Sequence, residues 1–176
     1  YMPVANFSGN LNLIVSASDG GNSGSGGART DTETSTLQVA AVNDAPTLAA
    51  PTVIPISLGG SGPITGIVAG DIDVAGGSMT QTLSVPEGTL AASSQAGVTV
   101  TGSGTQNLVL TGTLSALNGF HAPTPRVSYT QAGSPSINVP LSIVVNDNGG
   151  TGSGGARTAS AGSMLRTGTL FMNGFE

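Results

Sequence analysis

The stretch that decides the fold is residues 141–158, which read Leu-Ser-Ile-Val-Val-Asn-Asp-Asn-Gly-Gly-Thr-Gly-Ser-Gly-Gly-Ala-Arg-Thr. A short β-branched run passes through Asn and Asp into a glycine-rich segment, which is typical of a β-strand entering a long turn. Residues 150–155 formally match G-x-G-x-x-G. No helix pattern follows them and the chain has no lysine, so we interpret the segment as a hairpin turn rather than a phosphate loop.

This stretch occurs twice, at a spacing of 128 residues. Residues 24–30 recur unchanged as residues 152–158. Four further positions agree at the same offset: Tyr1 with Tyr129, Asn10 with Asn138, Leu13 with Leu141, and Asp19 with Asp147. Matches outside the glycine-rich segment argue against coincidence. The chain is therefore expected to hold the last strands of one module with a linker (1–45), a complete second module (46–160) and a C-terminal tail (161–176).

Strand signals dominate the rest of the chain. We expect strands near residues 11–15, 36–39, 64–68, 79–85, 98–101, 108–111, 127–130 and 141–145. One short helix is expected after Thr113, which can cap residues 114–118, with Gly119 ending it. Many short strands with turn residues between them predict an all-β Greek-key sandwich of the immunoglobulin-like class. Because the first module would lack covering strands, its apolar residues Leu13, Val15, Leu37 and Val39 are expected to be exposed.

Composition excludes several classes of protein. The chain has four arginines, nine acidic residues and a formal net charge of −5, which excludes an electrostatically driven nucleic-acid binder. The absence of cysteine excludes disulfides and cysteine-based zinc sites. No apolar run approaches the ~18 residues of a membrane helix, so no membrane span is expected. Around the serines there is no G-x-S-x-G, and a lone His121 is expected to be a loop or packing residue rather than a base.

A family resemblance rests on an ordered set of motifs. Residues 13–20 have the form L-x-V-x-A-x-D-G; a turn, the strand 36–39 and the linker Val-Asn-Asp-Ala-Pro (42–46) follow, and Asp71 and Asp73 form a D-x-D. This order resembles the end of one cadherin repeat and the start of the next. The intervening sequence is similar to the cadherin-like tandem repeats of large bacterial surface and secreted adhesins. The ending 170–176 also resembles tails of secreted proteins from some Gram-negative bacteria.

The resemblance implies a calcium site at the junction between repeats. Its ligands would be Asn43, Asp44, Asp71, Asp73 and Asp147. Calcium takes six to eight oxygen ligands, and the alternate residues of an extended D-x-D point to one side. The Glu motifs of the vertebrate three-ion cluster have no clear match, so one ion or none is expected. The alternative is that these Asp and Asn residues only form turns.

Function is therefore expected to be structural and adhesive rather than enzymatic. The leading hypothesis is an extracellular cell-surface or secreted module, stiffened by calcium, whose partners are neighbouring repeats of the same chain and a cell-surface or matrix ligand. A metal-free inert spacer and an accessory module of a secreted hydrolase remain as alternatives.

Overall fold

The computed structural model describes residues 1–21, 24–57, 60–74, 76–122, 124–133 and 137–167 of the 176-residue chain. The chain forms two compact units, Tyr1–Val42 and Asn43–Glu176. The division lies three residues before the boundary predicted at 45/46. The fold is all-β, as predicted, with a single short helix among the described residues.

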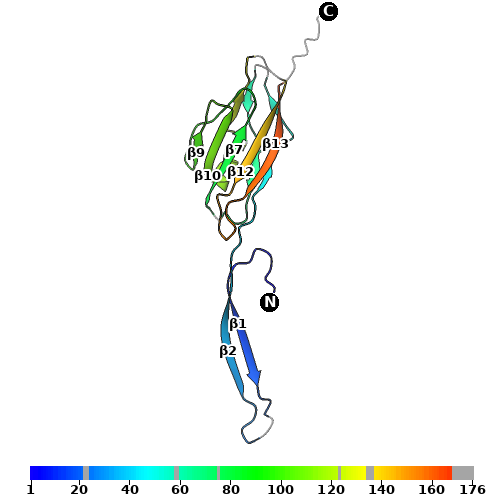
Figure 1. The fold of residues 1–176 in the computed structure, drawn as a ribbon, viewed down its shortest axis with the longest axis vertical. Helices are drawn as coiled ribbons and strands as arrows, with labels where there is room; N and C mark the ends of the chain where they lie inside the picture. Colours follow the sequence, from blue (N-terminus) through cyan, green and yellow to red (C-terminus); the bar gives the residue numbers. More distant parts are fainter. Residues whose placement is uncertain (22–23, 58–59, 75, 123, 134–136, 168–176) are drawn as a thin grey trace, which may run out of the picture. The chain divides into compact units, whose positions relative to one another are not determined.

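The first unit is a two-stranded antiparallel hairpin. Strand β1 (Gly9–Ser18) pairs with β2 (Thr30–Val39) in an unbroken register from Gly9↔Val39 to Ser18↔Thr30 (Figure 1). Its apolar side chains are exposed as predicted, with exposed fractions of 55% for Leu13, 55% for Val15 and 39% for Leu37. Val39 is half-buried, contrary to the prediction. A lone hairpin has no second layer to cover its face.

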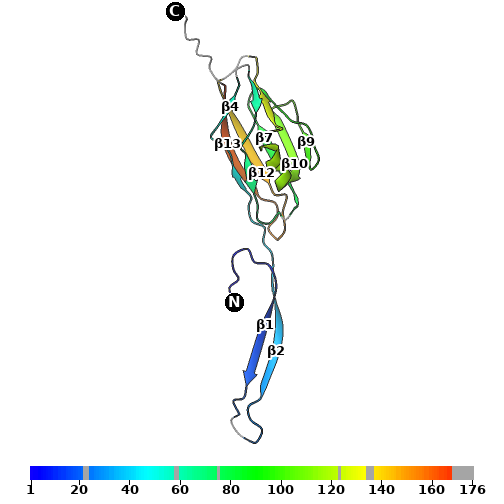
Figure 2. The same ribbon diagram turned by 180° about the vertical axis from the view of Figure 1, so that it is seen from behind.

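The second unit is built on a six-stranded sheet of order β4-β13-β12-β7-β10-β9. Figure 1 shows its strands side by side, and Figure 2 shows β4 beyond β13 at the edge. All neighbours are antiparallel except β13 and β4, which are parallel. The strands are β4 (Val53–Ile56), β7 (Ser78–Ser84), β9 (Val98–Thr101), β10 (Asn107–Thr113), β12 (Asn138–Asn146) and β13 (Thr158–Thr167).

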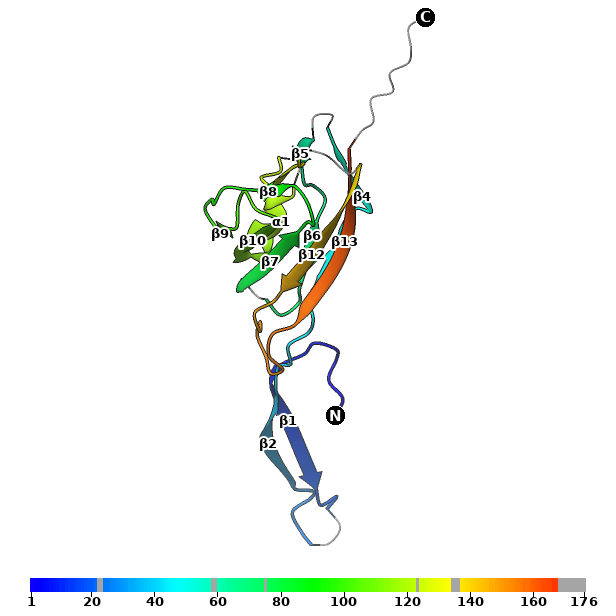
Figure 3. The same ribbon diagram turned by 45° about the horizontal axis from the view of Figure 1, so that its top comes forward.

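A second layer closes the sandwich. It contains the three-stranded sheet β5-β11-β8 and the two-stranded sheet β3-β6 (Figure 3). The strands are β3 (Thr47–Ala49), β5 (Ser61–Pro63), β6 (Val68–Gly70), β8 (Thr89–Ala91) and β11 (Ser128–Thr130). Helix α1 (Leu114–Phe120) lies against β6, β7 and β10. Thr113 caps it as predicted, its side chain accepting a hydrogen bond from the backbone N–H of Ala116.

Alternation along the strands creates the core between these layers. Along β12, Val139, Leu141, Ile143 and Val145 are buried while the residues between them face outward. Ile143 pairs with Leu83 of β7, which pairs in turn with Leu108 of β10, and both leucines are also buried. One contiguous apolar cluster results, so the sheet needs no aromatic-rich core to close.

Three sequence predictions are corrected. Residues 64–67 lie outside every strand, because Pro63 precedes them and Gly66 takes a positive φ of 76° against the ring of Pro51. The helix runs to Phe120, one residue past Gly119. Residues 161–167 belong to β13 rather than to a separate tail, because Leu165 is buried and pairs with Ile54. Residues 168–176, where the rest of the tail was predicted, lie outside the described residues.

Candidate metal centre

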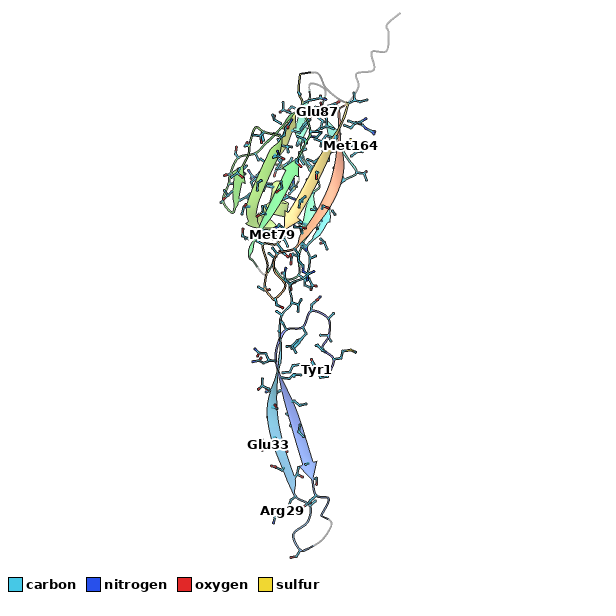
Figure 4. All side chains as sticks on the ribbon, in the orientation of Figure 1. Tyr1, Arg29, Glu33, Met79, Glu87 and Met164 are labelled. Atoms are coloured by element: carbon cyan, nitrogen blue, oxygen red, sulfur yellow. The ribbon has the colours of Figure 1, made fainter. Side chains whose placement is uncertain are left out.

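The glycine-rich loop after β12 is held by one aspartate. Asp147 Oδ1 accepts hydrogen bonds from the backbone N–H groups of Gly149 and Arg157, both at 2.8 Å, and Asp147 N donates to Arg157 O at 3.1 Å. An aspartate that bonds the backbone two residues ahead forms an Asx turn, which explains Asp before the Gly pair. Met79, labelled in Figure 4, marks this end of the sheet, and Glu87 and Met164 mark the other.

The first unit contains the same arrangement. Asp19 Oδ1 accepts from Gly21 N and Arg29 N, both at 2.9 Å, and Asp19 N donates to Arg29 O at 3.1 Å. Figure 4 shows Arg29 at the loop end of this hairpin. The 128-residue sequence repeat is therefore also a structural repeat.

Asn43 is inserted into the loop of the second unit. It is only 1% exposed. Its Nδ2 donates to Asp147 Oδ2 at 2.7 Å and to Gly155 O at 2.9 Å, and its backbone N donates to Ser153 O at 2.8 Å. Because both side-chain partners can only accept, the amide orientation is fixed and Oδ1 points away from them. The linker is thus fastened to the loop by backbone and side chain together.

The D-x-D segment after β6 meets the same place. Asp71 Oδ1 accepts from Asp73 N at 2.7 Å and from Val74 N at 3.1 Å. Asp73 Oδ2 accepts from the backbone N–H of Asp44, and Asp73 O accepts from Thr151 Oγ1 at 2.7 Å. We call this meeting point the linker pole: residues 43–44, residues 71–74 and the loop 147–157.

Two oxygen atoms at the linker pole are buried without a hydrogen-bond partner among the described residues. They are Asn43 Oδ1 and Asp71 Oδ2. Gly150 lies beside the first, since a Cβ at Gly150 would collide with Asn43 Oδ1 and would lie 3.5 Å from the Cβ of Asp73. Buried polar atoms almost always find a partner, so each such orphan calls for an explanation. Carboxylate and amide oxygens are ligands that calcium prefers, so the chemistry of the atoms fits the predicted ion.

The electrostatics of the linker pole favour ionised Asp147. Burial, the largest single effect, raises its pKa. The hydrogen bonds from Arg157 N, Gly149 N and the Asn43 amide, together with the charge of Arg157, outweigh burial and hold the pKa below its usual value of 3.8. Asp147 therefore carries its negative charge at neutral pH, although the residue is only 1% exposed.

The structure places the five predicted ligands at one end of the second unit, but it does not bring all five side chains into contact with one another. Asn43 and Asp147 are in direct contact. Asp44 is joined to Asp73 through its backbone, and its own side chain is exposed. Among the described residues, no three His, Cys, Asp or Glu side chains form a group that could hold a metal ion. Sequence reasoning missed the part played by residues 150–155, although the unchanged repetition of residues 152–155 was an available signal.

His121 lies in the core instead of at the linker pole. It is 3% exposed, with Nε2 2.8 Å from Gln81 Oε1 and Nδ1 3.3 Å from Ile64 O. Burial lowers its pKa below 6.5, and the bond to Ile64 opposes that shift only in part. A neutral imidazole has one N–H, so His121 donates to Ile64 O through Nδ1 and accepts at Nε2 only when the Gln81 amide is turned to present its NH₂ group.

Outside the linker pole, a surface hollow of about 810 Å³ lies over β12, β13 and the loop before β4. Its lining, which includes Ser84, Ser142 and Met164, carries no titratable side chain. Within the described residues, no helix is long and apolar enough to span a membrane. Neither models of known protein families nor the curated proteins give a match to this chain.

Proposed function

We propose that this chain is a structural segment of an extracellular repeat protein, and that calcium bound at the linker pole stiffens the start of each module. The single observation that carries the proposal is the pair of buried oxygens, Asn43 Oδ1 and Asp71 Oδ2, for which the described part of the chain supplies no hydrogen-bond partner. They lie where the linker, the D-x-D segment and the glycine-rich loop meet. A cation is the partner that two such oxygens can share.

The residues differ in the part they would play. Asn43 Oδ1 and Asp71 Oδ2 would bind the ion directly, with Asp73 beside them. Asp147 already accepts hydrogen bonds on both carboxylate oxygens, so it would act by orienting Asn43. Asp44, exposed next to the site, would add charge. Water would complete the six to eight ligands that calcium takes.

A bound cation would also offset repulsion. Four of the chain's nine acidic residues are Asp44, Asp71, Asp73 and Asp147, and all four belong to the linker pole. Backbone hydrogen bonds, the side-chain amide of Asn43 and the charge of Arg157 offset part of this repulsion. Neutralising part of it would make the linker residues harder to detach, which is the property that a stalk of modules in series requires.

Thermal unfolding with calcium and with a chelator tests the proposal. Extracellular calcium modules bind at about 10⁻⁴–10⁻³ M, and a ligand at ~100 times its dissociation constant stabilises the folded state by about 2.7 kcal/mol. Calcium should raise the melting temperature of the wild type, magnesium should raise it less, and Asp71→Asn should abolish the calcium response. Exposed Asp31→Asn in the first unit is the control and should keep the response. A wild-type curve that is the same in EDTA and in about 10–100 mM calcium, which is ~100 times that range of dissociation constants, would remove the calcium claim.

A metal-free spacer is the second candidate. It is favoured by the backbone hydrogen bonds of Asp71 and Asp147, which give each residue a turn-forming role without any ion. The same experiment separates the two, because a spacer gains no stability from calcium. The cell-surface or matrix ligand stays a prediction that rests on the adhesin resemblance.

A further inference from the structure

The hairpin of the first unit lacks the cover that its counterpart in the second unit has. At an offset of 128 residues, Leu13 corresponds to Leu141 and Leu37 to Leu165. Leu13 is 55% exposed where Leu141 is 1% exposed, and Leu37 is 39% exposed where Leu165 is 1% exposed. The same apolar pattern is therefore core in one copy and surface in the other.

Two strands flank the corresponding hairpin in the second unit, and a second layer covers its apolar face. Strand β7 pairs with β12, with Ile143 opposite Leu83, and β4 pairs with β13, with Leu165 opposite Ile54. Both flanking strands and nearly all of the second layer come from residues 43–128, the segment that we call the module front. By the same offset, Val15 and Leu37 of the first hairpin stand where Ile143 and Leu165 stand.

The loop of the first hairpin also lacks, among the described residues, a contact that the loop of the second unit makes. Asp147 uses Oδ1 for its own loop and Oδ2 for the amide of Asn43. Asp19 uses Oδ1 in the same way, but no described residue donates a hydrogen bond to its Oδ2. The carbonyl of Gly27 corresponds to that of Gly155, which also accepts from Asn43. The loop thus presents two acceptors at the positions that hold an asparagine amide in the second unit.

We propose that the hairpin 9–39 is a docking surface for a module front of the pattern of residues 43–128, carried ahead of the hairpin in the same polypeptide. Strands equivalent to β4 and β7 pair with its two edges, the second layer of that front covers Leu13, Val15 and Leu37, and an asparagine equivalent to Asn43 binds Asp19 Oδ2 and Gly27 O. The apolar face and the open loop point independently to this one occupant. The proposal rests on the repeat architecture of the proposed function and not on calcium.

The topology favours this occupant over a second copy of the chain. In the second unit the front precedes its hairpin along the chain, with Tyr129 just before it at the position of Tyr1. A second copy offers a front whose sheet already contains its own β12 and β13. It could dock only if its own hairpin β12–β13 were displaced, which would break the pairing of β12 with β7 and of β13 with β4.

The direct test places a copy of residues 43–128 immediately ahead of Tyr1 in the full chain. Hydrogen exchange and thermal unfolding are measured in EDTA, so that failure of the calcium proposal does not affect the result. We expect the amides of Gly21 and Arg29 to become protected and Leu13→Ala to lower the melting temperature as much as Leu141→Ala does. In the unextended chain, Leu13→Ala should leave the melting temperature unchanged. Alanine at the asparagine of the added front should reverse the loop protection.

A second design guards against failure of the extended protein to fold. Residues 138–167 of the full chain are replaced by a copy of residues 10–39, a segment of equal length. If the hairpin fits this kind of front, the second unit should still unfold cooperatively, at a lower temperature. Loss of cooperative unfolding here, together with unprotected loop amides in the extended chain, overturns the proposal. A stable dimer of the unextended chain that protects Leu13 would also overturn it, in favour of a second copy.

Discussion

Replacing Asn43 with alanine tests how firmly the linker is held. The substitution removes a hydrogen bond to the Asp147 carboxylate at 2.7 Å and one to the Gly155 carbonyl at 2.9 Å. A bond to a charged group contributes about 1.5–3 kcal/mol and a neutral one about 1 kcal/mol, so the loss is about 2.5–4 kcal/mol. The substitution also removes Oδ1, an oxygen that is buried without a described partner, and ending that burial cost stabilises the variant by about 1–3 kcal/mol. The mid-range values leave a net cost of about 1 kcal/mol without calcium.

Calcium changes this balance if Asn43 Oδ1 is a ligand. The oxygen then has a partner, and its removal returns nothing. Asn43→Ala should cost about 2.5–4 kcal/mol in calcium, because the hydrogen bonds are lost with no relief. The wild type should gain stability from calcium, and the variant should gain much less.

Urea unfolding in EDTA and in calcium measures both free energies. Asn138→Ala is the matched control, since Asn138 is exposed and accepts one long bond from Arg166 Nε at 3.2 Å. It should stay within about 0.5 kcal/mol of the wild type in both conditions. If Asn43→Ala costs no more than the control, the linker is not held as described. If its cost is equal with and without calcium, Asn43 is not a ligand.

Three further predictions concern the second unit and its copy. Leu141→Ala should cost about 2–5 kcal/mol in thermal unfolding, and Leu13→Ala less than about 0.5 kcal/mol; equal costs would contradict the difference in burial. Because burial lowers the pKa of His121 in the folded state, the free energy of unfolding should keep its full value above pH 6.5 and fall as the pH drops below it. In His121→Gln the urea midpoint should change less between pH 7 and about 5. An unchanged slope in that variant would assign the pH effect elsewhere. Gly88→Ala (φ 76°) should lower stability more than Gly104→Ala (φ 83°), because a Cβ at Gly88 would lie 2.6 Å from atoms of β11, while one at Gly104 meets no atom within 4 Å. Both variants share the cost of a positive φ, about 1–3 kcal/mol. Equal unfolding midpoints for the two variants would refute the clash at Gly88.

Local patterns predicted the elements that depend on neighbouring residues. The hairpin β12–β13 follows from an apolar run and a glycine-rich turn, and α1 follows from a capping threonine with Leu117 and Phe120 on one face. The exposure of Leu13 and Leu37 followed from the repeat alone, because a copy without its covering strands must show its apolar face.

Long-range pairing escaped prediction. Strand β4 spans four residues, contains Pro55, and becomes a strand only through parallel pairing with β13, more than a hundred residues later. A proline is tolerated there because β4 is an edge strand. Asn43 was proposed as a ligand by resemblance, but its sequence context gave no sign that it would be inserted between Asp147 and Gly155. Such contacts depend on the closed fold.

The parallel pairing of β4 with β13 determines how the second unit responds to mechanical load. Force transmitted along the chain enters near Asn43, reaches β4 after passing β3, and leaves at the end of β13 at Thr167. Because the strands run in the same direction, the two pulls slide them past each other. The register from Met164↔Val53 to Thr167↔Ile56 is then sheared as a whole.

Antiparallel strands pulled apart from their open end behave differently. Handles at Asn138 and Arg166, which face each other at the open end of β12 and β13, would open that ladder one pair at a time. In single-molecule pulling we expect a higher rupture force from handles at Asn43 and Thr167 than from these two. The strand that completes the sheet edge would thus also act as a clamp, and the resistance of a string of such modules to tension would be set by a few bonds in each.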